Sequence, residues 1–177
     1  MLGVMTMRWR RLTVEKTAVT AVLTLWYLLC PQIGYENSLT PLEPLWAHAL
    51  YMVSHANVWH LMGNLFVLWI MRNRIYLFAS VMIAFAASFL PVYGLFWPLE
   101  GVTMGFSGVL FAIFGVKWGA YCQSFEPGGK RMTREAHAEF AVKAMPFALI
   151  GIAIPHVNWC LHLYCLLGGF AYGRWGR

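Results

Sequence analysis

The sequence contains no aspartate, and its acidic residues are seven glutamates. Only 11% of its residues are charged, whereas 60% are hydrophobic. A soluble domain of this size needs far more charge to cover its surface, so the composition excludes an ordinary soluble protein and indicates a polytopic membrane protein. The lack of aspartate also excludes a Ser-His-Asp triad and any paired-aspartate protease.

Motifs for metals, redox chemistry and nucleic acids are lacking as well. The four cysteines have no paired metal-binding or redox spacing, and there is no zinc HExxH motif. We therefore expect no metal and no cofactor. The net charge is +6, but the basic residues lie between apolar segments rather than on one amphipathic face. Nucleic acid is accordingly not expected as a partner.

What the chain does contain is a series of six apolar segments. A helix of about 20 residues crosses the hydrocarbon core of a bilayer, and most of the segments approach that length. We predict an all-α fold, a six-transmembrane-helix bundle that forms one membrane domain over residues 17–174, with a basic tail at 1–16 and a short tail at 175–177. The segments cover residues 17–33, 50–71, 75–97, 101–121, 140–154 and 156–172.

The basic residues give these segments a direction. All 13 lysines and arginines lie in the two tails, or in and beside the second-to-third and fourth-to-fifth connections. The remaining three connections contain no lysine or arginine, and the charged residues in them are Glu36, Glu43 and Glu100. This positive-inside pattern predicts that both termini are cytoplasmic. The protein is expected to be a multi-pass integral membrane protein in contact with the lipid bilayer, and a compact basic core suits a bacterial inner membrane.

Four of the polar side chains within the apolar segments are expected at similar depths: His60, Asn64, Ser107 and His162. Such groups are costly inside a membrane and by default suggest function. At 1.5 Å per residue, Ser107 and His162 both lie about 9 Å from the outer ends of their segments, so all four share the outer half of the membrane. Two structural alternatives remain open, because a serine can bond to its own helix and polar residues can clasp neighbouring helices.

These residue types permit acyl-transfer chemistry. A serine hydroxyl becomes a good nucleophile when a base takes its proton, and His162 is the candidate base for Ser107 in a dyad. His60 and Asn64 are four residues apart on one helix face, and both can donate hydrogen bonds to an oxyanion. His55 would lie about 140° round that helix from His60, which suits a metal pair badly. We expect His55 to orient the loop above the helix instead.

Glycines indicate that the fourth and sixth segments approach closely. Gly115 and Gly119 on one, and Gly169 and Gly173 on the other, have the small-xxx-small spacing of tight membrane packing. Generic helix packing would produce the same pattern. Phe111, one turn after Ser107, is placed to pack on an imidazole.

The order and spacing of these motifs resemble the rhomboid family of intramembrane serine proteases. The resemblance rests on His55-x4-His60-x3-Asn64, on Gly105-Phe-Ser107-Gly108 and on His162 followed by Gly169, and it covers the chain from about residue 50 onward. It implies Ser107 as nucleophile, His162 as general base, and an oxyanion hole of His60, Asn64 and the Ser107 amide. Gly105 would shape the loop before the serine, with His55, Phe111, Gly108 and Gly169 in supporting positions. Cys165 stands where the family usually has glycine, and Phe111 where it often has tyrosine.

Three candidate functions can be compared with this pattern. The first is an intramembrane endopeptidase that cleaves transmembrane segments of other membrane proteins near the outer face. The second is a proteolytically inactive rhomboid-like protein that binds or escorts membrane proteins; such members typically lack the serine or the histidine, and this chain has both. The third is a small transporter, which would predict internal repeats and ionisable groups near the midplane of the membrane, and neither is seen.

Overall fold

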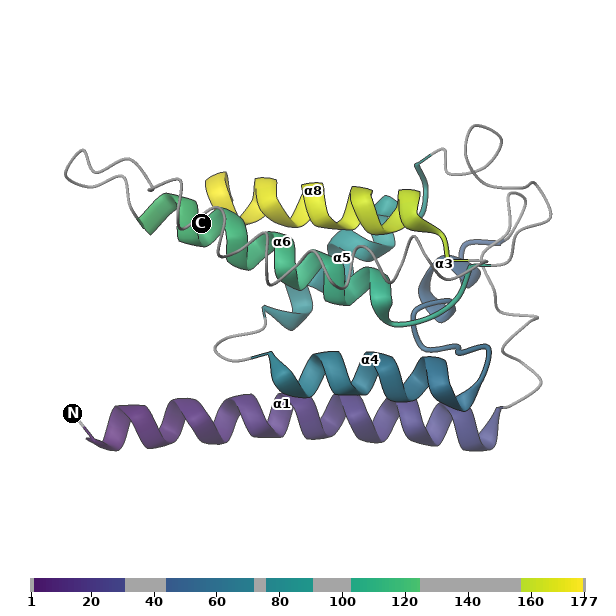
Figure 1. Ribbon diagram of the computed structural model, residues 1–177, viewed down its shortest axis with the longest axis horizontal. Helices are drawn as coiled ribbons and strands as arrows, with labels where there is room; N and C mark the ends of the chain where they lie inside the picture. The colour runs from purple at the N-terminus through teal and green to yellow at the C-terminus, as the bar shows by residue number, and fades with distance from the viewer. Residues whose placement is uncertain (1, 31–43, 72–75, 91–102, 125–156, 177) are drawn as a thin grey trace.

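The computed structural model describes residues 2–30, 44–71, 76–90, 103–124 and 157–176, which form six helices (Figure 1). The described part of the chain is therefore all-α, as predicted. The predicted fifth segment, 140–154, lies outside the described residues. The helices are α1 (Leu2–Leu29), α3 (Ala47–Leu50), α4 (Val58–Ile70), α5 (Leu77–Ala87), α6 (Ser107–Ser124) and α8 (Trp159–Trp175).

Several helix boundaries differ from the predicted segments. Residues 2–16, predicted as a separate tail, continue into α1, because no glycine or proline occurs between residues 4 and 29. The second helix begins at Val58 rather than near residue 50, because the Asn57 side chain caps it by accepting the His60 amide at 2.9 Å. The fourth begins at Ser107 rather than at 101, so the serine is its first residue.

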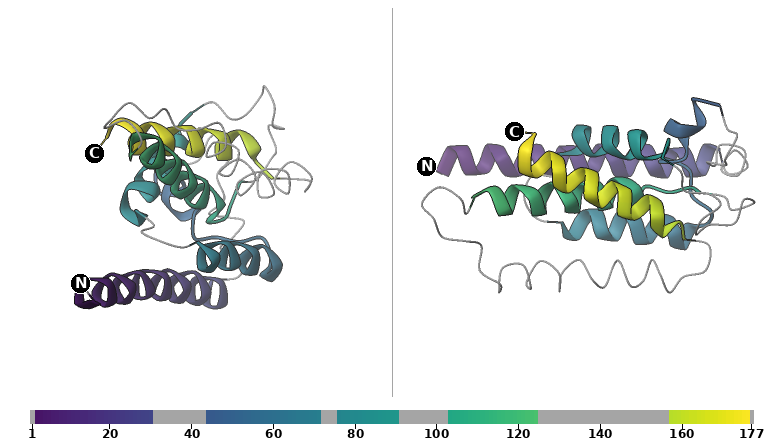
Figure 2. Two further views of the ribbon diagram at one scale, coloured as in Figure 1. Left: turned by 60° about the vertical axis from the view of Figure 1, so that its left-hand side comes forward. Right: turned by 90° about the horizontal axis from the view of Figure 1, so that it is seen from above.

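The described helices form two groups. Figure 1 shows α1 and α4 side by side along one side of the molecule, with α5, α6 and α8 along the other, and the left view of Figure 2 shows the same separation. The contacts of α4 with α1 and with α6 are both sparse compared with the contact between α6 and α8. By length and apolarity together, no helix among the described residues qualifies as a membrane span.

The most extensive helix contact in the described structure is between α6 and α8. A Cβ atom added at Gly115 would lie 2.1 Å from the Leu166 carbonyl oxygen, and one at Gly169 would lie 2.3 Å from that of Ala112. The two backbones therefore touch, and the close approach predicted from the glycine spacing is present. Gly115 faces residues 166–170 and Gly119 faces residues 170–174, so the two helices run in the same direction.

Hydrogen bonds from a lysine and a tryptophan join α1 to the C-terminal end of α4. The Lys16 ammonium donates to the carbonyls of Trp69, at 3.2 Å, and Met71, while the Trp69 indole donates to the Thr20 hydroxyl at 3.0 Å. A cation at the C-terminal carbonyls of a helix also favours the helix dipole. The last basic residue of the predicted N-terminal tail, Lys16, thus caps the second predicted segment.

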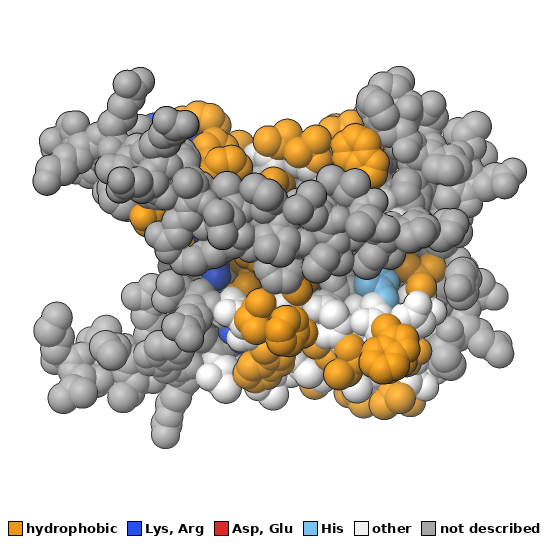
Figure 3. All heavy atoms as spheres, viewed as in Figure 1, with side chains coloured by type: hydrophobic (Ala, Val, Ile, Leu, Met, Phe, Trp, Pro, Cys, Tyr) orange, Lys and Arg blue, Asp and Glu red, His pale blue; other side chains and the backbone are white. Residues whose placement is uncertain are grey.

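Large hydrophobic side chains are exposed on the outer helices. Hydrophobic side chains appear at the surface of both groups on the face drawn in Figure 3. Scattered exposed hydrophobics are ordinary, but so many large ones on a small chain suit an apolar surrounding. They include Val22, Leu25, Leu28 and Leu29 on α1, Trp59, Met62 and Phe66 on α4, and Phe78 and Met82 on α5.

Candidate active site

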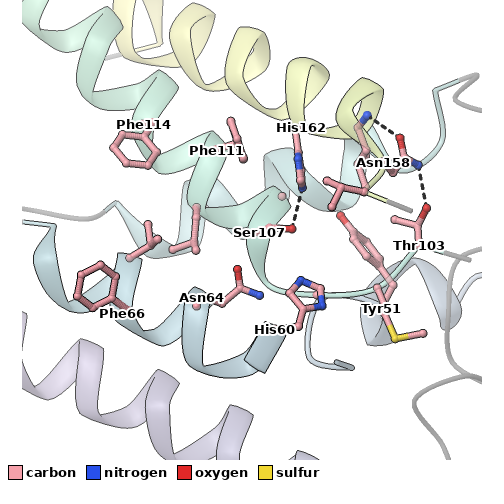
Figure 4. A pocket seen from close by; sticks show the side chains of 18 of the residues that line it. Tyr51, His60, Asn64, Phe66, Thr103, Ser107, Phe111, Phe114, Asn158 and His162 are labelled. Carbon is pink, nitrogen blue, oxygen red and sulfur yellow. Dashed lines mark hydrogen bonds between the residues drawn. The ribbon is translucent and has the colours of Figure 1, made fainter. Parts of the chain in front are cut away.

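Ser107 and His162 come together at the start of the two parallel helices. The Ser107 Oγ atom lies 2.7 Å from His162 Nε2, within hydrogen-bonding distance (Figure 4). The Phe111 ring, one helical turn after the serine, stacks on the imidazole with centroids 4.4 Å apart and planes 12° from parallel. His162 Nδ1 is buried and has no hydrogen-bond partner among the described residues. Stacking, rather than an acidic third residue in the described structure, therefore orients the ring.

Gly105 gives the chain its sharp turn into α6. Its φ angle is 121°, in the region that disfavours every residue with a side chain. Its amide donates to the Tyr51 carbonyl at 2.7 Å, and a Cβ atom here would lie 2.6 Å from the His60 ring. Both the backbone angle and the packing therefore require glycine. The turn places Ser107 at the helix start, where amides have no acceptor within the helix and the dipole favours negative charge.

His55 does not lie on the helix that carries His60, which corrects the geometric prediction. Because α4 begins at Val58, His55 belongs to the loop before it, and the two rings meet edge to face with centroids 5.2 Å apart. His55 Nδ1 lies 3.1 Å from the Val53 carbonyl, which can only accept, so Nδ1 carries the proton and Nε2 is an acceptor. This bond ties the His55 ring to the loop before α4, and the expected role of His55 in orienting that loop stays a prediction.

The acceptor nitrogen of His55 in turn fixes Asn64. His55 Nε2 accepts from Asn64 Nδ2 at 3.0 Å and from the Phe106 amide at 3.4 Å. Since Nε2 needs donors, the Asn64 side chain must present its NH2 group rather than its oxygen. His55 therefore links α4 to the residue that directly precedes Ser107.

A cavity of about 330 Å³ between α4, α6 and the start of α8 is lined by Ser107, His162 and Asn64, among others. Figure 4 shows polar side chains at one end and phenylalanines at the other. The cavity thus has a polar end that continues into an apolar pocket. The polar end includes Tyr51, His60, Asn64, Thr103, Ser107, Asn158 and His162, and the apolar part includes Gly63, Phe66, Val67, Leu110, Phe111 and Phe114.

Comparison with known families identifies the fold. The Rhomboid domain family matches residues 42–176, which is most of the 177-residue chain and all of the site. The chain belongs to the rhomboid family. Among curated proteins, no match was found. Rhomboid family proteins are membrane proteins, which agrees with the composition and with the exposed hydrophobic side chains.

Two glycines of the rhomboid motifs occupy different surroundings. Gly169 lies in the backbone contact between α6 and α8, where no side chain fits. A Cβ atom at Gly108 would lie 3.4 Å from Cys165 Sγ and 3.5 Å from the Tyr51 hydroxyl, which is ordinary contact. Cys165 is fully buried beside Gly108 and fills the space that a glycine at its position would leave. The cysteine that stands at residue 165 in place of the usual glycine therefore affects how α8 packs against α6, the helix that begins with Ser107.

A second serine–histidine pair in this rhomboid has the opposite hydrogen-bond polarity. His48 Nδ1 lies 2.8 Å from Ser88 Oγ, and the His48 ring stacks on Phe89. The Ser88 hydroxyl donates to the Phe85 carbonyl at 2.5 Å, so its oxygen accepts from His48. The histidine cannot take a proton from a hydroxyl that already donates elsewhere. This pair joins α3 to the end of α5, outside the cavity.

Three residues of the rhomboid site were not found from the sequence: Tyr51, Thr103 and Asn158. The Tyr51 carbonyl holds Gly105, its hydroxyl donates to the Ala84 carbonyl at 2.9 Å, and Asn158 donates to Thr103 at 2.8 Å. Asn158 carried a signal, because asparagine directly before an apolar helix is a typical N-cap. Nothing local marks Tyr51 or Thr103, since their partners are distant in sequence.

Proposed function

We propose that this rhomboid is an intramembrane serine endopeptidase that cleaves transmembrane segments of other membrane proteins. The observation that carries the proposal is the 2.7 Å contact between Ser107 Oγ and His162 Nε2 inside the cavity. The distribution of basic residues supports cytoplasmic termini and a site that opens toward the outer face, as in a bacterial inner membrane. Scissile bonds near the outer ends of transmembrane segments would reach such a site.

The dyad performs both halves of acyl transfer. His162 Nε2 takes the hydroxyl proton as Ser107 Oγ attacks the scissile carbonyl carbon. The tetrahedral intermediate collapses when the leaving amine receives that proton from Nε2. Water then attacks the acyl-serine ester with Nε2 again as base, and the returning proton restores the Ser107 hydroxyl. The Phe111 ring face lies against the imidazole and stabilises the cation that forms in each half.

Three donors are available for the oxyanion. The Ser107 amide points from the start of α6, where the helix dipole favours negative charge. The Asn64 amide carries two hydrogens, and since His55 takes one, the second remains for the oxyanion. His60, packed on Gly105, lines the same end of the cavity. No metal or cofactor is required for this chemistry.

The apolar part of the cavity suits a membrane-embedded substrate. The rings of Phe111 and Phe114 lie within about 11 Å of Ser107 along α6, on the basis of the helical rise, and the Phe66 ring of α4 lines the same cavity. They provide an apolar surface for side chains next to the scissile bond. Close to Ser107 the space is bounded by Gly105 and the His60 ring, which favours small residues at the bond itself.

Substitution of Asn64 tests the oxyanion hole. We expect Asn64→Ala to lower kcat about 10²-fold with little change in KM, because this donor acts mainly in the transition state. Asn64→Asp should lose at least as much activity, since a carboxylate repels the oxyanion. Kinetics with a purified model transmembrane substrate in detergent measure both. An unchanged kcat in Asn64→Ala would remove this residue from the hole and leave it as an interhelical clasp.

A fluorophosphonate probe tests the proposed function directly. We expect the probe to label Ser107 in the wild-type protein, and peptide mapping to locate the adduct there. Ser88→Ala is the matched control, because it removes the serine of the other serine–histidine pair and should leave labelling intact. A wild-type protein that neither reacts with the probe nor cleaves a transmembrane substrate would favour the inactive rhomboid-like protein that binds membrane proteins.

A further inference from the structure

A second hydrogen bond runs beside the contact between Ser107 and His162. Asn158 Nδ2 donates to Thr103 Oγ1 at 2.8 Å (Figure 4). Thr103 precedes Ser107 by four residues, and Asn158 precedes His162 by four, so the two bonds join the same pair of segments. Both side chains are buried, with 7% and 5% of their surface exposed, and both line the cavity.

The direction of this bond is fixed by the cap of α8. Asn158 Oδ1 accepts the Leu161 amide at 3.1 Å, which orients the side-chain amide and turns its NH2 group toward Thr103. The Asn158 carbonyl also accepts the His162 amide at 3.3 Å. One residue therefore holds the first turn of α8, the backbone of His162 and the segment that leads to Ser107.

The position of the bond along the helices explains why it matters. The backbone contact between α6 and α8 involves Gly115 and Gly119, which begin eight residues after Ser107, about 12 Å along the helix. That contact fixes the backbones in the later turns of the two helices, whereas near their starts the contacts are between side chains, such as the Phe111 and His162 rings. The bond from Asn158 to Thr103 joins the starts. Ser107 and His162 thus lie between the glycine contact on one side and the hydrogen bond from Asn158 to Thr103 on the other.

We infer that Asn158 and Thr103 are positioning residues of the proposed protease, and that their hydrogen bond holds His162 in register with Ser107. The inference rests on the proposed function. Neither residue needs to touch the substrate's reacting atoms. Loss of the bond should lower the rate of the first chemical step by about 5- to 10-fold, the effect of one neutral hydrogen bond.

Substitutions at both ends of the bond test this inference. Thr103→Val removes the acceptor while keeping the shape, and Asn158→Ser keeps a helix cap but cannot reach Thr103. Thr20→Val is the matched control, because it removes a hydroxyl that accepts the Trp69 indole at 3.0 Å between α1 and α4. The measurements are the rate of Ser107 modification by the fluorophosphonate, kcat and KM with a model substrate, and the melting temperature.

We expect Thr103→Val and Asn158→Ser each to lower kcat and the modification rate about 5- to 10-fold, with KM nearly unchanged. The double variant should be no slower than either single variant, and Thr103→Ser should restore the rate. Thr20→Val should lower the melting temperature as Thr103→Val does but leave the modification rate unchanged. Equal modification rates in Thr103→Val, Thr20→Val and the wild type would overturn the inference while leaving the proposed function intact. A wild-type protein inert to both probe and substrate would overturn both.

Discussion

Ser107→Ala and His162→Ala are each expected to abolish cleavage of a model transmembrane substrate, lowering kcat by roughly 10⁴- to 10⁶-fold. The nucleophile and its base act in one step, across a 2.7 Å contact, so losing either stops the chemistry. For the same reason the double variant should be no worse than the single ones. Cleavage assays in detergent, with the melting temperature measured in parallel, give the result.

The control for this result is Ser88→Ala, which breaks the other serine–histidine pair outside the cavity and should retain cleavage. If Ser107→Ala or His162→Ala keeps activity within tenfold of the wild type, the dyad mechanism is wrong. The contact would then be a polar clasp between α6 and α8.

Gly169→Ala is expected to produce a large loss of stability. The added Cβ atom would lie 2.3 Å from the Ala112 carbonyl oxygen, and the conflict is with backbone that cannot rotate away. The helices must separate, at a cost of about 1–3 kcal/mol or more. Because α6 and α8 carry Ser107 and His162, activity should fall together with the melting temperature. Thermal unfolding in detergent measures the loss of stability.

Gly63→Ala is the matched substitution, because a Cβ atom there meets nothing within 4 Å. Replacing this mid-helix glycine should leave the melting temperature unchanged or raise it, since alanine favours a helix by up to about 1 kcal/mol. A melting temperature in Gly169→Ala equal to that of Gly63→Ala would show that the backbone contact does not limit stability.

Residue order and spacing were enough to predict the family, the all-α class and the close approach of the two glycine-bearing helices. Each of these depends on a local pattern, such as apolar length or the spacing of small residues. The boundaries were less accurate, because caps and strained turns decide them. Asn57 starts α4 eight residues later than the apolar segment suggested, and Gly105 delays α6 until Ser107. The membrane topology and the roles of the site residues stay predictions.

His55 illustrates why part of the site could not be predicted. Helical geometry placed it away from His60, but the loop before α4 folds it back against both His60 and Asn64. The bond between Asn158 and Thr103 joins residues 55 positions apart, and no periodicity reports such a pairing. Similarly, nothing in the sequence indicated that Ser88 pairs with His48, and in the structure both hydrogen-bond direction and position outside the cavity distinguish this pair from Ser107 and His162.

The sequence by itself determined which chemical groups the protein carries, since residue types and their spacing encode an apolar surface, a serine hydroxyl, imidazole groups and small residues for helix contact. The tertiary structure alone decided which of these groups meet, in which tautomer and at which end of a helix. The physical reason is that hydrogen bonds and backbone contacts between distant segments depend on ångström-scale placement, which many residues determine together.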